Sequence, residues 1–191
     1  MCITFDDGCA TDLLIAAQLL LERHLNATFY VTVNHLGKRG YLTPAQLIEL
    51  ADLGFEIGSH SLNHCHLNDL KLSEVEVELG ESQKQLEDII GCRVVHFSCP
   101  GGRTSAVIKQ VARDTGYESV ATSKIGLNTA KTEHYALSRI AVKKGLKAEA
   151  LAGLCRGEKL LLSRAQDLAF SAAKRVLGNS VYERVRSAAL R

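Results

Sequence analysis

The sequence contains only two prolines, and its longest apolar run, from Leu13 to Leu21, is short and interrupted by Gln18. Two prolines beside fifteen glycines exclude a collagenous or proline-rich chain. An apolar run this short excludes a membrane-spanning helix. Basic residues followed by an apolar stretch, which begin a signal peptide, are absent from the first residues. These absences predict a soluble, cytoplasmic protein as the sequence is written, with an export or anchor segment ahead of Met1 as the alternative.

The six cysteines are spread along the chain without a Cys-x-x-Cys pair. This spacing excludes a zinc ribbon, and a chain of 191 residues is too long to depend on disulfides for its core. We therefore expect reduced thiols, most of them buried.

Length and charge predict one globular domain with a distinct C-terminal part. A chain of 191 residues, 46% of them apolar, can bury a core of its own. Residues 1–138 hold 11 basic and 17 acidic residues, whereas residues 139–191 hold 12 basic and 4 acidic residues. The basic part lacks the interleaved aromatics of nucleic-acid-binding chains, so no nucleic-acid partner is expected. We expect a helix there that packs on the domain, with weak contact to an anionic membrane surface as the alternative.

Short runs of β-branched and aromatic residues alternate with helical patterns through most of the chain. The expected helices start at signals such as Thr43 before Pro44 and Ser73 before Glu76. This alternation is typical of βαβ units around a parallel sheet. The expected helices are 13–21, 44–53, 73–90 and 104–115, and the expected strands are 3–5, 27–33, 55–58, 94–97, 119–122 and 138–142.

After Gly145 the pattern becomes helical only, and residues 165–190 form an amphipathic stretch rich in basic residues. We therefore divide the chain into a βα domain, residues 1–145, and a helical C-terminal extension, residues 146–191.

Carboxylates and histidines follow two of the expected strands, at the strand ends where parallel α/β folds bind ligands. Asp6 and Asp7 follow the first strand, and His60 and His64 follow the third. If the third loop makes one helical turn, both imidazoles lie on the same face. Two histidines and a carboxylate can hold a hydrolytic metal, and the second carboxylate can serve as base. Taken separately, each pair is better explained by an ordinary feature, an Asp-Asp-Gly turn and two surface or capping histidines.

The same residues resemble the polysaccharide deacetylase family. Thr4-Phe5-Asp6-Asp7-Gly8 and His60-Ser61-x-x-His64 are similar to two motifs of these carbohydrate esterases, and the resemblance covers about residues 2–142. It implies an α/β fold, a distorted barrel of about seven βα units, here N-terminally minimal and followed by a helical appendage. It also implies removal of N-acetyl or O-acetyl groups from a glycan such as chitin oligosaccharides, peptidoglycan or exopolysaccharide.

The resemblance further implies a divalent metal, usually zinc, with cobalt, manganese or nickel as alternatives. Asp6 would be the base, and Asp7, His60 and His64 would be the metal ligands. Donor atoms that bind one such ion should lie within roughly 3–4 Å of one another.

A third family motif, Arg-x-Pro-x-Gly, is matched by Ser98-Cys99-Pro100-Gly101-Gly102. Serine thus takes the place of the arginine that orients the base, and Arg103 or Arg139 is a candidate substitute. The resemblance implies that the Gly101 N–H binds the oxyanion.

Two later family motifs are missing. The chain has no tryptophan, and Leu137-Ser138-Arg139 stands where a Leu-x-x-His motif would carry the general acid. Here the sequence is similar to a branch found among exopolysaccharide-biosynthesis proteins. His134 is the candidate acid, with a surface histidine as the alternative. The remaining histidines, interpreted as structural or solvated, are His24, His35, His66 and His96.

Three other functions are alternatives to a deacetylase. A catalytically inactive metal- or carbohydrate-binding homologue fits the missing arginine and histidine, but it would not need Asp6. An amidohydrolase acting on a small cyclic amide or ureide could use the same residues. An iron oxygenase also uses two histidines and a carboxylate, but the Asp6-Asp7 pair favours the deacetylase.

Overall fold

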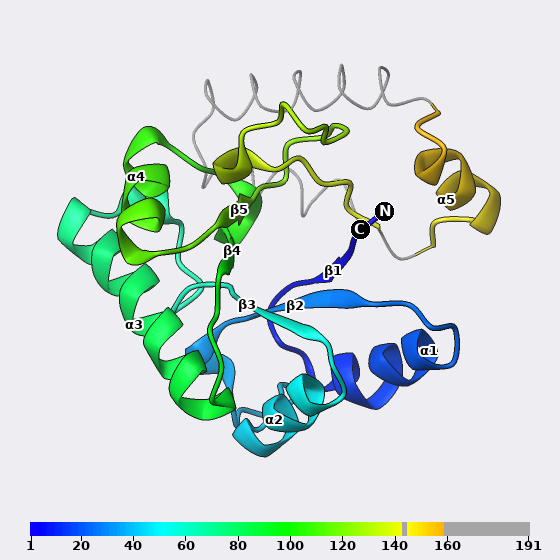
Figure 1. Ribbon diagram of the computed structural model, residues 1–191, viewed down its shortest axis with the longest axis horizontal. Coiled ribbons are helices and arrows are strands. Elements are labelled where there is room, and N and C mark those ends of the chain that lie inside the picture. Colours follow the sequence, from blue (N-terminus) through cyan, green and yellow to red (C-terminus); the bar gives the residue numbers. More distant parts are fainter. Residues whose placement is uncertain (143–144, 159–191) are drawn as a thin grey trace, which may run out of the picture. The chain divides into compact units, whose positions relative to one another are not determined.

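The computed structural model describes residues 1–142 and 145–158, and its sheet has five parallel strands. Their spatial order is the order of the chain, as in a barrel of βα units. Connections between parallel strands are right-handed, and here each strand is followed in space by the next one in the chain. The connecting helices therefore lie on the same face of the sheet. Figure 1 shows these helices on the outside of a curled sheet. The strands are β1 (Ile3–Phe5), β2 (Ala27–Val31), β3 (Glu56–Ser59), β4 (His96–Ser98) and β5 (Ser119–Ala121).

Each crossover contains a helix. The first is a π-helix, η1 (Asp12–Ala17), that continues into α1 (Gln18–Leu21), and the others are α2 (Pro44–Asp52), α3 (Leu72–Ile90) and α4 (Ala106–Thr115). The predicted α/β class is therefore confirmed. No helix in residues 1–142 or 145–158 is long and apolar enough to cross a bilayer. Short 3₁₀ turns also occur, at η2 (Val33–His35), η3 (Leu67–Asp69), η4 (Pro100–Gly102) and η5 (His134–Ala136).

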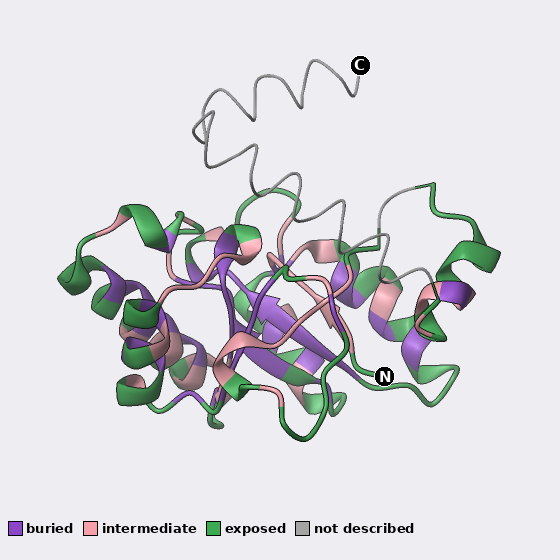
Figure 2. Cartoon of the chain, turned by 90° about the horizontal axis from the view of Figure 1, so that it is seen from above, coloured by how far each residue is buried: buried purple, intermediate pink, exposed green. Residues whose placement is uncertain are grey.

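The core lies between the sheet and these helices. All five residues of β2 are buried, as expected for a strand covered on both faces. Figure 2 shows the buried residues concentrated on the strands and the inner faces of the helices. Large, fully buried side chains include Phe29, Leu47, Leu79, Phe97 and Tyr117.

Two predicted helix starts differ from the structure. The backbone N–H of Lys71 donates to the Glu74 carboxylate at 2.7 Å, so α3 begins one residue before Ser73. Serine is the usual cap and lysine has no side-chain acceptor, so the sequence favours Ser73, but the helix starts where Glu74 binds the Lys71 N–H. Ser105 caps α4 by accepting from the Ile108 N–H. Thr43, by contrast, caps α2 as predicted.

The predicted strand at 138–142 is not found. Next to β5 there is one isolated bridge, between Ala121 and Leu137. Beyond it, both backbone polar groups of Ser138 are bonded to the Asn128 side chain, with the N–H donating at 2.9 Å and the carbonyl accepting at 2.9 Å. In a parallel ladder alternate residues bond to the same neighbour, so Ser138 faces away from β5 and its bonds to Asn128 do not compete with that pairing. Leu137 bonds to Val120 and Thr122. The Arg139 N–H, in contrast, bonds to the Lys124 carbonyl, past the end of β5, so the bridge does not continue as a regular strand.

The chain forms two compact units. The first contains residues 1–123 and 128–138, and it holds the whole sheet. The second contains residues 124–127 and 139–191, and its described part includes α5 (Ala148–Cys155). The boundary at 145/146 stays a prediction. The amphipathic helix predicted at 165–190 lies outside the described residues.

Candidate metal centre

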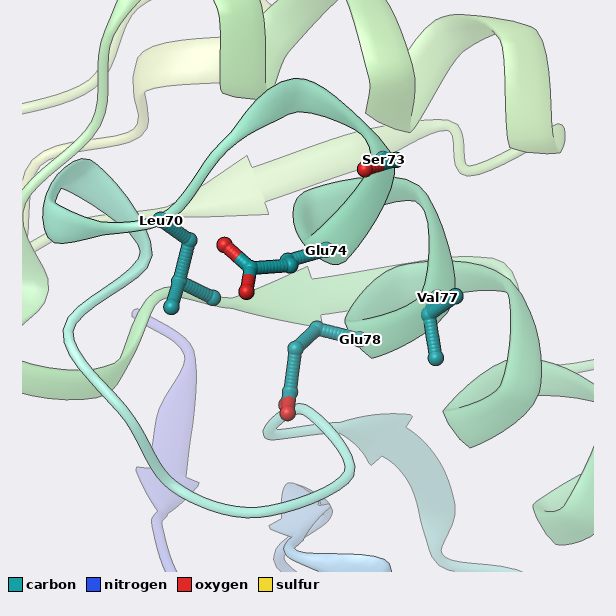
Figure 3. A pocket seen from close by; sticks show the side chains of 5 residues that line it. All are labelled: Leu70, Ser73, Glu74, Val77 and Glu78. Atoms are coloured by element: carbon teal, nitrogen blue, oxygen red, sulfur yellow. The ribbon is translucent and has the colours of Figure 1, made fainter.

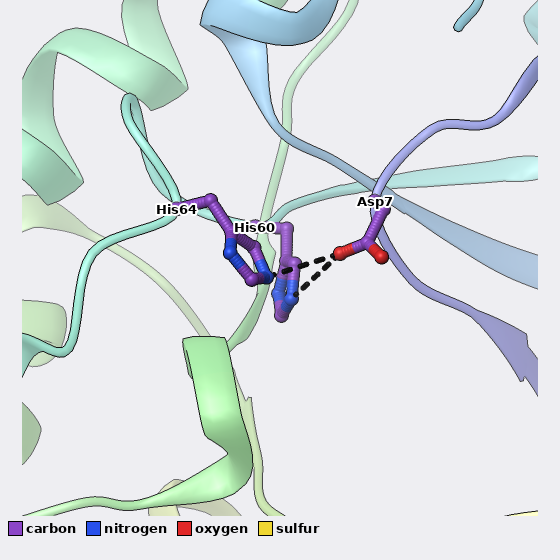
Figure 4. A group of neighbouring side chains, drawn as sticks. All are labelled: Asp7, His60 and His64. Carbon is purple, nitrogen blue, oxygen red and sulfur yellow. Dashed lines mark ion pairs between the residues drawn. The ribbon is translucent and has the colours of Figure 1, made fainter. Parts of the chain in front are cut away.

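Asp7, His60 and His64 meet at the carboxyl ends of β1 and β3 (Figure 4). Asp7 Oδ1 lies 3.1 Å from His64 Nε2 and 3.5 Å from His60 Nε2. The three donor atoms lie within 4.8 Å of one another, somewhat wider than the expected 3–4 Å. Two imidazole nitrogens and one carboxylate oxygen form a donor set that suits zinc and similar divalent ions. The residues therefore fit a divalent cation.

The two histidines converge without the helical turn that their spacing suggested. The loop from His60 to His64 is irregular, and Ser61 and His64 have φ values of +68° and +58°. Asp7 also has a positive φ, of +81°. These are three of only four non-glycine residues with positive φ in the described chain. Such conformations are costly and often occur at functional sites.

A hydrogen bond from Nδ1 fixes the orientation of the His60 imidazole. Its Nδ1–H donates to the Ser98 carbonyl at 2.7 Å, and the residue is only 2% exposed. A carbonyl can only accept, so the neutral ring leaves the Nε2 lone pair facing Asp7. Burial lowers the pKa of His60, which favours this neutral form.

The Asp7 carboxylate and the His64 imidazole are hydrogen-bonded to each other. The hydrogen bond from His64 lowers the pKa of Asp7, and the same bond raises the pKa of His64. Asp7 is therefore anionic over a wide pH range, as a metal ligand must be.

Asp6 lies beside this group but is not part of it. The Ser98 hydroxyl is 3.5 and 3.4 Å from the two Asp6 carboxylate oxygens, and it donates to them. His60 Nε2 is 4.0 Å from Asp6 Oδ2. Ser98 thus contacts Asp6 through its hydroxyl and His60 through its carbonyl, in the place of the motif arginine.

The glycines of η4 occupy positions that no side chain would fit. Gly101 and Gly102 have φ values of +66° and +71°. A Cβ at Gly101 would lie 2.8 Å from the His66 ring, and one at Gly102 would overlap Ser123. Among the hydrogen bonds within residues 1–142 and 145–158, none uses the Gly101 N–H. That N–H is available to a ligand.

Other histidines have positions that the sequence did not indicate. His134 begins η5 and is exposed, and its assignment as general acid stays a prediction. His35, interpreted as structural, has its ring 5.8 Å from the His64 ring and 4.3 Å from the Tyr41 ring. His66 lies against Gly101. Both belong to loops outside the carboxylate and glycine motifs, and only the fold brings them to the site.

Sequence comparisons identify relatives of the chain. A family profile described as polysaccharide deacetylase matches residues 1–120. YxkH of Bacillus subtilis, named provisionally as a polysaccharide deacetylase, is 30% identical over 148 residues, or 78% of this chain and 53% of that protein. The chitooligosaccharide deacetylase of Azorhizobium caulinodans is 32% identical over 122 residues, or 63% of this chain and 57% of that protein. The chain spans about half the length of these curated relatives.

Solved structures share the fold. The deacetylase PplD of Streptococcus pyogenes matches with a TM-score of 0.74 and 24% identity over 78% of this chain and 67% of that chain. BC0361, a polysaccharide deacetylase from Bacillus cereus, matches with a TM-score of 0.72 and 25% identity over 78% of this chain and 49% of that chain. Since the profile covers most of the chain and the fold agrees, the chain belongs to the polysaccharide deacetylase family.

Proposed function

We propose that the protein removes N-acetyl or O-acetyl groups from a glycan by metal-dependent hydrolysis. The observation that carries the proposal is the meeting of Asp7, His60 and His64 beside Asp6, on a fold of this family. Two relatives are named a chitooligosaccharide deacetylase and a peptidoglycan-N-acetylglucosamine deacetylase. An N-acetylated glycan, including the exopolysaccharide suggested by the sequence, is therefore the proposed substrate.

Asp7, His60 and His64 would hold the metal, with zinc favoured because the donor set is two histidines and one carboxylate. A divalent cation bound there supplies Lewis-acid activation of water and of the acetyl carbonyl.

Two other groups act on the reacting atoms in this proposal, and a third positions one of them. Asp6 accepts a proton from the attacking water, and the Ser98 hydroxyl orients the Asp6 carboxylate. The Gly101 N–H donates to the oxygen that becomes negative as the acetyl carbon turns tetrahedral. When the bond from that carbon to the amine breaks, the nitrogen takes a proton. Asp6, protonated by the water that it has activated, can supply this proton, and His134 is the other candidate donor because Leu137-Ser138-Arg139 lacks the histidine of the family motif.

The inactive binding homologue is the second candidate. The missing motif arginine favoured it, but Ser98 supplies a hydrogen bond to Asp6. The retained base and the free Gly101 N–H favour an enzyme.

Acetate release from N-acetylated oligosaccharides tests the proposal, with chitin, peptidoglycan and exopolysaccharide fragments as substrates. The metal-free protein is compared with protein loaded with zinc, cobalt, manganese or nickel. We expect release to depend on added metal and to fall about 10²–10⁴-fold in Asp6→Asn. Asp52→Asn, at an exposed carboxylate of α2, is the matched control and should release acetate normally. Release by Asp6→Asn at the wild-type rate, or no release with any metal, would contradict the proposal.

A further inference from the structure

The loop that carries His64 is anchored by a buried carboxylate of α3. We propose that Glu78 is a positioning residue for His64, holding the loop in the conformation that presents its imidazole to the metal. This inference rests on the proposed function, because it takes His64 as a ligand.

Glu78 binds the loop through both carboxylate oxygens. Oε2 accepts the backbone N–H of Leu62 and that of Asn63, each at 3.0 Å. Oε1 accepts from the Asn63 side-chain amide at 2.6 Å. Glu78 is only 6% exposed. Figure 3 shows it extending from α3, beside Glu74, in a pocket at the start of the helix. One carboxylate thus accepts the hydrogen bonds of two loop amides that would otherwise need water as their acceptor.

The anchored amides lie between two strained residues. Ser61 precedes them and His64 follows them, both with positive φ. In an L-residue this conformation is disfavoured and persists only where neighbouring contacts impose it. The Leu62 and Asn63 amides are therefore the points at which Glu78 can impose the turn.

Two further contacts complete the anchorage. The His64 N–H donates to the Ser61 hydroxyl at 3.0 Å. The Asn63 side-chain oxygen accepts from Asn34, in η2, at 2.6 Å. Glu78 thus connects α3 to a loop that is also bonded to η2. Without Glu78 the bonds to Ser61 and Asn34 remain, but the loop loses the direct hydrogen bonds to α3 that the described residues show.

The metal affinity of a folded Glu78 variant shows whether the carboxylate is only structural or also positions His64. Loss of a structural group lowers stability and leaves metal affinity unchanged once the protein is folded. Loss of a positioning group lowers metal affinity in the folded protein as well. Residues that orient metal ligands typically change metal affinity by about 10–100-fold.

The experiment compares zinc affinity by calorimetry, and the visible spectrum of the cobalt-loaded protein, in wild type, Glu78→Ala and Glu78→Gln. We expect Glu78→Ala, at a temperature where it is folded, to bind zinc about 10–100-fold more weakly and to alter the cobalt spectrum. Glutamine keeps an oxygen for the two backbone amides. The Asn63 and Asn34 side chains can both turn their amides, so that Asn63 accepts from the new NH₂ group and still bonds to Asn34. Glu78→Gln should therefore recover most of the affinity. Glu81→Ala, at an exposed position of α3, is the matched control.

Wild-type zinc affinity and an unchanged cobalt spectrum in folded Glu78→Ala would overturn the inference. If Glu78→Ala does not fold, Glu78→Asp replaces it, because its carboxylate is withdrawn by one methylene and should weaken zinc binding in the same way. Amide hydrogen exchange at Leu62 and Asn63 in the metal-free protein separates this inference from the proposed function. Faster exchange in the Glu78 variant supports the anchorage even if the wild type binds no zinc, whereas unchanged exchange refutes it.

Discussion

At the scale of single residues, Gly101 is subject to two separate constraints. Its φ of +66° disfavours any side chain, and the His66 ring occupies the space that a Cβ would take. Gly91, which ends α3, has nearly the same φ, of +70°, but nothing lies within 4 Å of its missing Cβ. Comparing alanine substitutions at the two glycines therefore separates the effect of backbone strain from the effect of a collision with His66.

We predict that Gly101→Ala and Gly91→Ala each lower the free energy of unfolding by about 1 kcal/mol, because alanine is strained at positive φ. Only Gly101→Ala should also reduce acetate release, at least tenfold, because the collision displaces the proposed oxyanion N–H. A double-mutant cycle with His66→Ala measures the coupling, and truncating His66 should restore part of the activity of Gly101→Ala. Additive losses in the cycle would show that His66 is not the cause.

At the scale of elements, the helix that follows β1 starts with a buried carboxyl group. Asp12, the first residue of η1, is 6% exposed, and its Oδ2 has no hydrogen-bond partner within the described residues. The pKa of Asp12 is raised from 3.8 to about 7. Burial is the main cause, a hydrogen bond from the Cys9 backbone opposes it, and the charges of Asp7 and Asp6 add to the increase. Folding thus favours the protonated form of this side chain.

A raised pKa in the folded state has a definite consequence for stability. Between pH 4 and pH 7 the folded protein binds more protons at Asp12 than the unfolded chain, so stability contributed by this group decreases as pH rises. The shift from 3.8 to about 7 corresponds to at most about 4 kcal/mol. We predict that the free energy of unfolding of Asp12→Asn lacks this decrease between pH 4 and pH 7, which the wild type shows.

Urea unfolding at pH 4.5 and pH 7.5 measures the difference. Asp52→Asn, at an exposed position, should keep the wild-type pH dependence. Identical pH dependence in Asp12→Asn and wild type would show that folding does not raise the pKa of Asp12.

At the scale of the whole molecule, the candidate metal centre joins distant parts of the sheet. Asp7 follows β1, whereas His60 and His64 follow β3, and β2 lies between these strands. An ion held by all three residues would cross-link the open sheet at its carboxyl edge. An unfolded chain does not bring the three side chains together, so metal should stabilise the folded state.

We predict that zinc at a free concentration of 100 times its Kd raises the free energy of unfolding by about 2.7 kcal/mol. Thermal unfolding with and without a chelator measures this gain, which His64→Ala should lose. His24→Asn is the control, since His24 is exposed, lies outside the centre and has a positive φ that asparagine tolerates. Equal stabilisation of His64→Ala and wild type would place the zinc elsewhere.

The sequence by itself determined the features that depend on neighbours in the chain. The period of apolar residues determined the alternation of strands and helices, and Thr43-Pro44 determined the start of α2, because capping is a contact over three residues. The candidate site was predictable for a similar reason. Asp6, Asp7, His60 and His64 each follow a strand, and parallel strands align their carboxyl ends.

Only the tertiary structure decided the features that depend on residues far apart in the chain. The predicted strand at 138–142 is not formed because its expected partner, β5, ends at Ala121, which leaves one isolated bridge at Leu137. The two histidines converge through a strained loop bound to Glu78 on α3, not through a helical turn. Ser98 contacts both Asp6 and His60, and His66 reaches Gly101, across separations of 35 or more residues. Such contacts leave no local period or motif, since each is formed only when the βα units close around a common core.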